Sequence, residues 1–235
     1  MPHPSIIAET YPQKAAYIMG NTGEIVTFRE LDERSNQGAQ LFRSVGLKTG
    51  DHIGIMLENN RDFMEIVWAA QRAGITYTPI STHLKMEEAA YILANCGAKP
   101  LIGALKLAEV AQELVPAATG IKHFYMVGGI RPGFESWEEA TDALPAERIA
   151  DEANGQAMLY SSGTTGYPKG VFAKSASDDV NTPPFLVPTL GLLFGYSEET
   201  VYLSPAPLYH AAPLHYTMMT TYNGGTTVIM EKFEP

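Results

Sequence analysis

The sequence predicts an α/β protein with mostly parallel sheets that are flanked by helices. Short apolar runs alternate along the chain with longer segments whose apolar residues recur at helical spacing. Strands that are separated by helices need crossover connections, and such connections make neighbouring strands parallel. Apolar residues make up 45% of the 235 residues, so the chain can bury a substantial core and is globular rather than disordered.

Three helices in the first part of the chain carry signals for their ends. Thr27 and Glu30 have the spacing of a capping box, in which a hydroxyl and a carboxylate bind each other's backbone N–H groups. A glycine follows the apolar stripe of each helix, at Gly46, Gly74 and Gly97, as is typical of a residue that ends a helix. The strands expected around these helices are residues 53–57, 77–80, 101–102 and 124–127.

Two more helices are expected before residue 145, and one of the three helices above has a further end signal. Asn60 is expected to cap the second of the three helices above, because its side-chain oxygen can accept a free N–H group. A further helix is expected over residues 104–114, and Ser136 with Glu139 repeats the capping-box spacing before a short helix.

A polar, unpatterned stretch over residues 145–154 predicts a boundary between two parts of the chain. We therefore expect residues 1–153 to form a first α/β subdomain and residues 154–235 to be the start of a second one that is incomplete. The elements expected after the boundary are strands over 157–160, 170–173, 201–203 and 226–230, and a helix over 214–222. An incomplete sheet leaves an apolar edge uncovered, so we expect self-association into a homo-oligomer.

The charge balance and cysteine content exclude several classes of protein. The chain carries 26 acidic and 16 basic residues, a formal charge of −10, which argues against nucleic acid or an anionic membrane as the main partner. Cys96 is the single cysteine, so no intramolecular disulfide is possible, as is common in a reducing cytoplasm. We see no signal peptide and no apolar stretch long enough for a transmembrane segment, so we expect a cytoplasmic protein.

The segment from residue 161 to residue 170 has the composition of a phosphate-binding loop. Its sequence SSGTTGYPKG holds three glycines, four serine or threonine hydroxyls and Lys169. Glycines let backbone N–H groups approach an anion, the hydroxyls add donors without bulk, and the lysine adds positive charge. It is not a Walker A loop, because Lys169 lies between Pro168 and Gly170 rather than between glycine and serine or threonine. A flexible linker is the alternative explanation of this composition.

The order of residues in this loop resembles the signature of the AMP-forming adenylating enzymes, a superfamily of acyl-CoA synthetases, peptide-synthetase adenylation domains and luciferases. The resemblance extends along the chain through four further stretches, which support the fold more than the chemistry: residues 27–36, 72–80, 90–93 and 97–102. It implies that the chain is a partial N-terminal domain of the acyl-CoA synthetase/luciferase-like fold.

The resemblance also implies roles for the loop. Its residues would hold the β- and γ-phosphates of ATP, with Lys169 nearby, and the first hydroxyl, that of Ser161, can reach magnesium. The phosphate-binding residues implied in this way are Ser162, Gly163, Thr164, Thr165 and Gly166.

A second functional stretch covers residues 203–214, where the family has a proline, an aromatic residue and a histidine beside the acyl pocket. By resemblance, His210 would contact the substrate carboxylate or the acyl adenylate, and Tyr209 would wall the pocket. His215 has no such support. The spacing of the two histidines is not that of metal ligands one helical turn apart, so we assign no zinc site.

The family implies a two-step reaction with ATP, magnesium and coenzyme A. A carboxylate attacks ATP to give an acyl adenylate, and a thiol then takes the acyl group. Many members follow the loop's strand with a Ser/Thr–His pair, which is absent from residues 172–179; this favours an acyl-CoA synthetase for fatty or related acids. The family's magnesium carboxylate, ribose aspartate and adenylating lysine lie beyond Pro235, so we expect this chain alone to be inactive. The alternative is a non-catalytic truncated module that binds a nucleotide or an acyl group.

Overall fold

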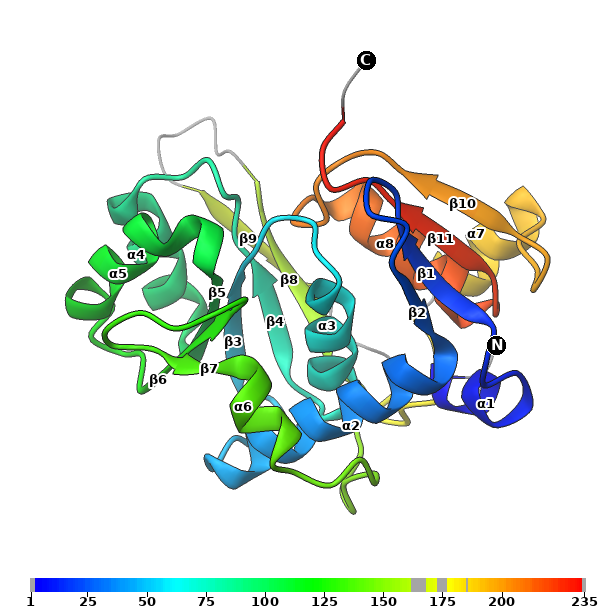
Figure 1. The fold of residues 1–235 in the computed structure, drawn as a ribbon, viewed down its shortest axis with the longest axis horizontal. Helices are drawn as coiled ribbons and strands as arrows, with labels where there is room; N and C mark the ends of the chain where they lie inside the picture. Colours follow the sequence, from blue (N-terminus) through cyan, green and yellow to red (C-terminus); the bar gives the residue numbers. More distant parts are fainter. Residues whose placement is uncertain (1–2, 162–167, 173–176, 185, 234–235) are drawn as a thin grey trace.

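A computed structural model of the chain describes residues 3–161, 168–172, 177–184 and 186–233 (Figure 1). They form two β-sheets with helices packed around and between them. The larger sheet has seven strands in the order β7-β6-β5-β3-β4-β8-β9. In that order the strands are Glu135–Ser136, His123–Val127, Ala98–Ala104, His52–Met56, Thr76–Pro79, Gln156–Ser161 and Lys169–Phe172.

The smaller sheet has four strands in the order β10-β11-β1-β2. These are Val201–Ser204, Thr226–Ile229, Ala15–Met19 and Ile25–Thr27. Within the described residues, the pairs β1–β2 and β8–β9 are antiparallel and the other strand pairs are parallel. The prediction of mostly parallel sheets flanked by helices is therefore confirmed.

Helices cover both faces of the seven-stranded sheet. Side chains of α4 and α5 form one apolar cluster with β3 and β5, while α2, α3 and α6 form a larger cluster on the other face. The helices are α1 Pro4–Thr10, α2 Phe28–Ser44, α3 Asp62–Arg72, α4 Met86–Cys96, α5 Ala108–Ala117, α6 Trp137–Asp142, α7 Leu186–Phe194 and α8 Ala211–Tyr222. A short 3-10 helix, Leu105–Leu107, precedes α5.

Helix α3 lies between the two sheets (Figure 1) and ties them into one core. The ring of Trp68 meets the ring of Tyr222 on α8 with centroids 4.9 Å apart. The hydroxyl of Tyr17 on β1 donates a hydrogen bond to the backbone oxygen of Arg61, just before α3, at 2.5 Å. Large aromatic side chains such as these contribute most of the apolar area that such a core buries.

The local end signals act as the sequence predicted. The Glu30 N–H donates to the Thr27 hydroxyl at 3.2 Å, and the Thr27 N–H donates to the Glu30 carboxylate at 2.8 Å, so the capping box is complete. Gly97 ends α4 in the left-handed conformation, at φ 68°. Asn60 accepts from the N–H groups of Asp62 and Phe63 and so caps α3.

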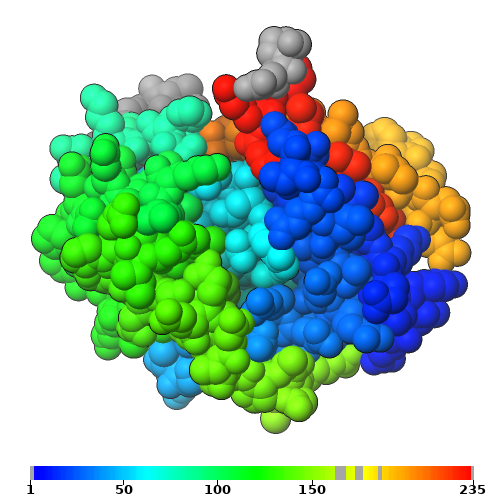
Figure 2. Space-filling view, viewed as in Figure 1, coloured from blue at the N-terminus to red at the C-terminus, as the bar shows by residue number. Residues whose placement is uncertain are grey.

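Five strands and helices were not anticipated from the sequence: α1, β1, β2, β7 and α7. Strand β2 has three residues and is too short to show a period, and β1 takes its partner β11 from the far end of the chain. Figure 2 shows this proximity, since the first residues, in blue, lie against the last, in red. Helix α7 contains Pro188 and Gly191, both of which have poor helix propensity.

Both sheets take strands from both sides of the boundary expected at residues 153 and 154. Strand β8 joins the seven-stranded sheet beside β4, where Gln156 pairs with Thr76, and β1 pairs with β11. The expected boundary therefore does not separate one sheet from the other. None of the helices that the structure describes combines the length and the apolar character that a membrane span requires.

Candidate functional site

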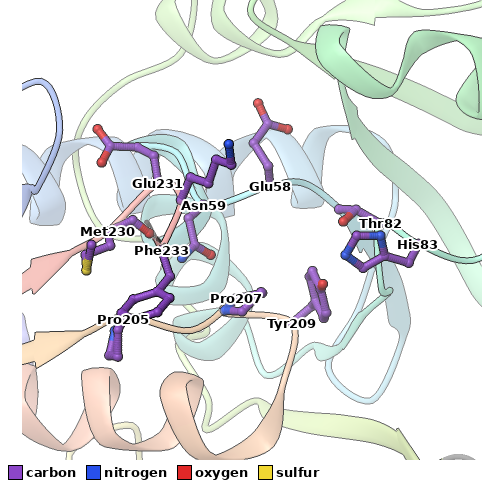
Figure 3. A pocket seen from close by; sticks show the side chains of 11 residues that line it. Glu58, Asn59, Thr82, His83, Pro205, Pro207, Tyr209, Met230, Glu231 and Phe233 are labelled. Atoms are coloured by element: carbon purple, nitrogen blue, oxygen red, sulfur yellow. Dashed lines mark hydrogen bonds between the residues drawn. The ribbon is translucent and has the colours of Figure 1, made fainter. Parts of the chain in front are cut away.

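A cavity of about 260 Å³ lies at the carboxyl ends of four strands, two from each sheet (Figure 3). In open parallel sheets, ligand sites lie outside the carboxyl ends of the strands. The cavity is lined by residues that follow β3 (Glu58, Asn59), β4 (Thr82, His83), β10 (Pro205, Pro207, Tyr209) and β11 (Met230, Glu231, Lys232, Phe233).

The predicted phosphate loop joins the carboxyl end of β8 to the start of β9. Two of its described residues, Ser161 and Lys169, are paired across this antiparallel hairpin, and both are exposed. Because β8 is parallel to β4, Ser161 lies at the same edge of the sheet as Thr82 in the cavity. The loop residues predicted to bind phosphates, Ser162, Gly163, Thr164, Thr165 and Gly166, lie outside the described residues.

Tyr209 and His210 lie where the chain leaves the cavity and enters α8. Tyr209 is buried and lines the cavity. His210 is the N-cap residue of α8, is exposed, and has its ring centroid 4.6 Å from that of Tyr209. The imidazole is thus presented next to the cavity rather than among the residues that line it.

Asn59 is a site residue that the sequence analysis missed. Its side chain is buried and hydrogen-bonds to backbone atoms of Ala206, Leu208 and Met230, which belong to the other sheet's loops. The signal was present, since this amide lies two residues after the apolar strand predicted at 53–57, at the end where parallel sheets bind ligands.

Charged groups of both signs surround the cavity. Burial raises the pKa of the Glu231 carboxyl, but the N–H groups of Asn21, Glu231 itself and Thr22, with the Thr22 hydroxyl, outweigh it, so that its pKa lies below the ordinary value. Glu58 lies 3.7 Å from the ammonium of Lys106. Among the described residues, no three His, Cys, Asp or Glu side chains come together as a metal site.

The fold and the site define an α/β domain whose cavity lies at the carboxyl ends of parallel strands. A family model described as AMP-binding enzyme matches residues 6–235, nearly the whole chain. The chain therefore belongs to the AMP-binding enzyme family, and the resemblance seen in its loop is confirmed.

Two curated relatives are CoA ligases. The chain is 25% identical to the long-chain-fatty-acid–CoA ligase FadD13 of Mycobacterium tuberculosis and 26% identical to the crotonobetaine/carnitine–CoA ligase of Escherichia coli (strain SE11). Each match covers 97% of this chain, but only 44% and 45% of the relatives. The chain thus spans less than half the length of these relatives and matches their N-terminal part.

Solved structures of the same class share the fold. The N-terminal domain of FACL13 from Mycobacterium tuberculosis superposes with a TM-score of 0.79 at 21% identity, over 100% of this chain and 58% of that domain. The anthranilate CoA ligase AuaEII, solved with anthranoyl-AMP, gives a TM-score of 0.79 at 20% identity, over 97% of this chain and 44% of that one.

Proposed function

We propose that this chain is the N-terminal portion of an ATP-dependent acyl-CoA synthetase. In the first step a carboxylate attacks ATP and pyrophosphate leaves, which gives an acyl-AMP. In the second step coenzyme A takes the acyl group and AMP leaves. The whole reaction needs groups beyond those of this chain, whose curated relatives are more than twice its length.

One observation carries this proposal: a chain of the AMP-binding family brings Tyr209 and His210 to a cavity at the sheet edge from which the 161–170 loop departs. The loop and the histidine stretch are about 40 residues apart in the sequence, and they belong to different sheets. Ser161, at the carboxyl end of β8, and the Tyr209–His210 pair, which follows β10, both come after the carboxyl end of a strand, and this supports a shared substrate that spans from phosphate to acyl group.

Each predicted residue has a chemical task in this proposal. The loop residues and Lys169 hold the β- and γ-phosphates and offset charge that builds up during adenylation. His210 donates to the carboxylate or the acyl adenylate, and Tyr209 walls the pocket. The local donors are needed because the chain as a whole carries a charge of −10 and repels ATP.

Magnesium fits this arrangement as a partner of ATP. Protein sites usually supply magnesium with one or two oxygen ligands, and the substrate phosphates supply others. The hydroxyl of Ser161, exposed at the end of β8, can supply one such oxygen. When bound, the ion would neutralise phosphate charge.

The substrate class proposed is a fatty or related carboxylic acid, with coenzyme A as the thiol and the cytoplasm as the location. The support is the activity of the relatives, which are ligases of long-chain fatty acids and of crotonobetaine or carnitine. No nucleic acid is proposed as a partner, because the strongly acidic chain would be repelled by it.

The experiment is to follow the reading frame past the codon of Pro235 and to assay its product with ATP, magnesium and a panel of carboxylic acids. We expect acid-dependent release of pyrophosphate, and thioester formation once coenzyme A is added. His210→Ala should lower kcat/KM of adenylation about 100-fold, as for the loss of one donor to developing charge. His215→Ala, five positions further along the chain in α8, is the matched control and should leave the rate unchanged.

The alternative is a non-catalytic module that binds a nucleotide or an acyl group, and the cavity that the chain forms by itself favours it. If the reading frame stops after Pro235, calorimetry of the chain with ATP and with an acyl-adenylate analogue should give heat. Steady AMP release by the 235-residue chain with any fatty acid would contradict both its expected inactivity and the module.

A further inference from the structure

The side-chain amide of Asn59 joins three backbone groups that belong to distant parts of the chain. Its Nδ2 donates to the carbonyl oxygens of Ala206 at 3.1 Å and Met230 at 2.8 Å. Its Oδ1 accepts from the N–H group of Leu208 at 2.8 Å. Asn59 is 5% exposed, so water has little access to compete for these hydrogen bonds.

The three partners determine both the residue type and its orientation. Two carbonyl oxygens require the two N–H bonds of an NH₂ group, and one N–H requires an acceptor, which together match a primary amide. An aspartate carboxylate would face two carbonyl oxygens without a hydrogen to donate. A leucine of similar volume would offer no partner to any of the three backbone groups, and for the buried N–H group of Leu208 this loss is costly.

The segment held in this way leads directly to the predicted site residues. Ala206 and Leu208 flank Pro207, and Tyr209 and His210 follow at once. The segment is also closed by the His210 N–H, which donates to the Pro207 oxygen at 3.1 Å. Figure 3 shows Asn59 between Met230 and Pro207, at the floor of the cavity that Tyr209 walls.

Asn59 also connects the two sheets at this point. It follows β3, the central strand of the seven-stranded sheet, whereas its partners follow β10 and β11 of the four-stranded sheet. Asn59 therefore links the segment before the Tyr209–His210 pair to the seven-stranded sheet, from which the predicted phosphate loop departs.

We propose that Asn59 is a positioning residue, which sets the place of Tyr209 and His210 against the carboxyl ends of β3 and β8. The functional part of this inference rests on the proposed role of His210 in binding the acyl adenylate. Asn59 itself acts through the Ala206–Leu208 backbone and has no part in the chemistry.

The test uses Asn59→Asp, with Asn60→Ala as a matched control in the 235-residue chain. Asn60 is the next residue and is also a hydrogen-bonded amide, but it caps α3 through Asp62 and Phe63 at 3.1 and 3.0 Å. Both variants lose hydrogen bonds, and only Asn59→Asp frees the segment before His210.

Two measurements by nuclear magnetic resonance report on the segment without any ligand. Amide hydrogen exchange at Leu208 should accelerate about tenfold in Asn59→Asp, because a carboxylate cannot donate to the Ala206 and Met230 carbonyl oxygens and is repelled by them, so that the segment loses two of its three anchors and opens more often. The ring-current shift that Tyr209 imposes on the His210 imidazole should shrink. In Asn60→Ala both signals should match the unchanged chain.

The inference is overturned if Leu208 exchange and the His210 signal stay unchanged in Asn59→Asp, or if Asn60→Ala changes them equally. Should Asn59→Asp fail to fold, Asn59→Ser is measured instead, since its hydroxyl keeps one of the three bonds and the same shifts are expected at smaller size.

Calorimetry with a non-hydrolysable acyl-adenylate analogue separates this inference from the proposed function. Binding that is at least about fivefold weaker in Asn59→Asp, with Asn60→Ala unchanged, would support both. If the unchanged chain gives no heat, the proposed role of His210 fails, whereas Leu208 exchange still decides whether Asn59 positions the segment.

Discussion

Strands β3 and β10 both lead into the cavity, yet they are built in opposite ways. Strand β3 lies between β4 and β5, and its Ile53 and Ile55 are fully buried. Strand β10 is an edge strand in which Val201 is 70% exposed and Leu203 is 54% exposed. On the β3 side, the residues of the site thus follow a strand that is buried in the core. On the β10 side, they follow an edge strand whose side chains are exposed in this chain.

The open edge lacks the usual protection of edge strands. Natural edges are commonly shielded by charged residues, prolines or covering elements, and β10 reads Val-Tyr-Leu-Ser. Three residues of the neighbouring α7 are exposed as well, namely Leu192, Leu193 and Phe194. The contrast teaches that stability should come from the β3 side, and self-association from the β10 side.

The largest effect should come from Arg72, at the end of α3 on the β3 side. It is fully buried and forms ion pairs with Asp32 at 2.7 Å and Glu152 at 3.1 Å. Arg72→Ala leaves both carboxylates without their buried partner, which should lower the free energy of unfolding by roughly 3–5 kcal/mol. Urea unfolding measures this change.

The matched control is Arg34→Ala, which breaks an exposed ion pair with Asp142. Exposed pairs contribute about 0–1 kcal/mol, so this variant should unfold almost like the unchanged chain. Similar losses in the two variants would contradict the view that the buried network, and not charge pairing in general, supports the β3 side.

The next effect compares the two strands directly. Ile55→Ala removes buried methyl groups from β3 and should cost about 3 kcal/mol through lost burial and a remaining cavity. Val201→Ala removes methyl groups that already face water, so its cost should stay within about 0.5 kcal/mol. If Ile55→Ala and Val201→Ala have equal midpoints of urea unfolding, β10 is packed as tightly as β3.

A smaller, pH-dependent effect is expected at Glu65 on α3. Burial raises the pKa of its carboxyl to about 8 from an ordinary 4.5, with Asp62 adding to the rise and Arg61 opposing it. As pH rises from about 4.5 to 8, the unfolded chain releases this proton while the folded chain retains it, so the folded state loses stability. Below pH 4.5 both states are protonated and the loss is absent.

Glu65→Gln should therefore be more stable than the unchanged chain at pH 8, by on the order of 2 kcal/mol, with the difference fading toward pH 5. Urea unfolding at pH 5, 6.5 and 8 checks this, with the exposed Glu113→Gln as control. A difference that stays constant across this range would show that the side chain acts by packing and not by its proton.

On the β10 side, a substitution should change the free energy of unfolding least and should change self-association most. Leu193, 71% exposed on α7, contributes to the apolar surface that should pair with a second copy. Leu193→Glu should weaken self-association about tenfold in light scattering, because a buried charge opposes an apolar contact. Ile130→Glu changes an exposed apolar residue in the turn after β6 and should leave self-association unchanged. If the unchanged chain is monomeric in light scattering, the expected self-association is wrong.

Sequence analysis alone predicted the alternation of strands and helices, the capping boxes, the glycines that end helices, and the family signature in residues 161–170. These features depend on contacts between near neighbours or on the order of a few residues, so they can be read locally. The same locality explains why β1 was missed: it lies between β2 and β11, and its pairing of Tyr17 with Thr227 joins opposite ends of the chain.

The location of the cavity and the hydrogen bonds that Asn59 makes beside it could be seen only in the tertiary structure. The sequence indicated Tyr209 and His210 by resemblance, but gave no reason to connect them with Asn59, about 150 positions earlier. Such a connection arises when strands of two sheets end at one place, and a single amide then satisfies backbone groups from two other segments. The physical reason is that buried polar groups need partners in space, and the order of the chain does not say which groups will meet.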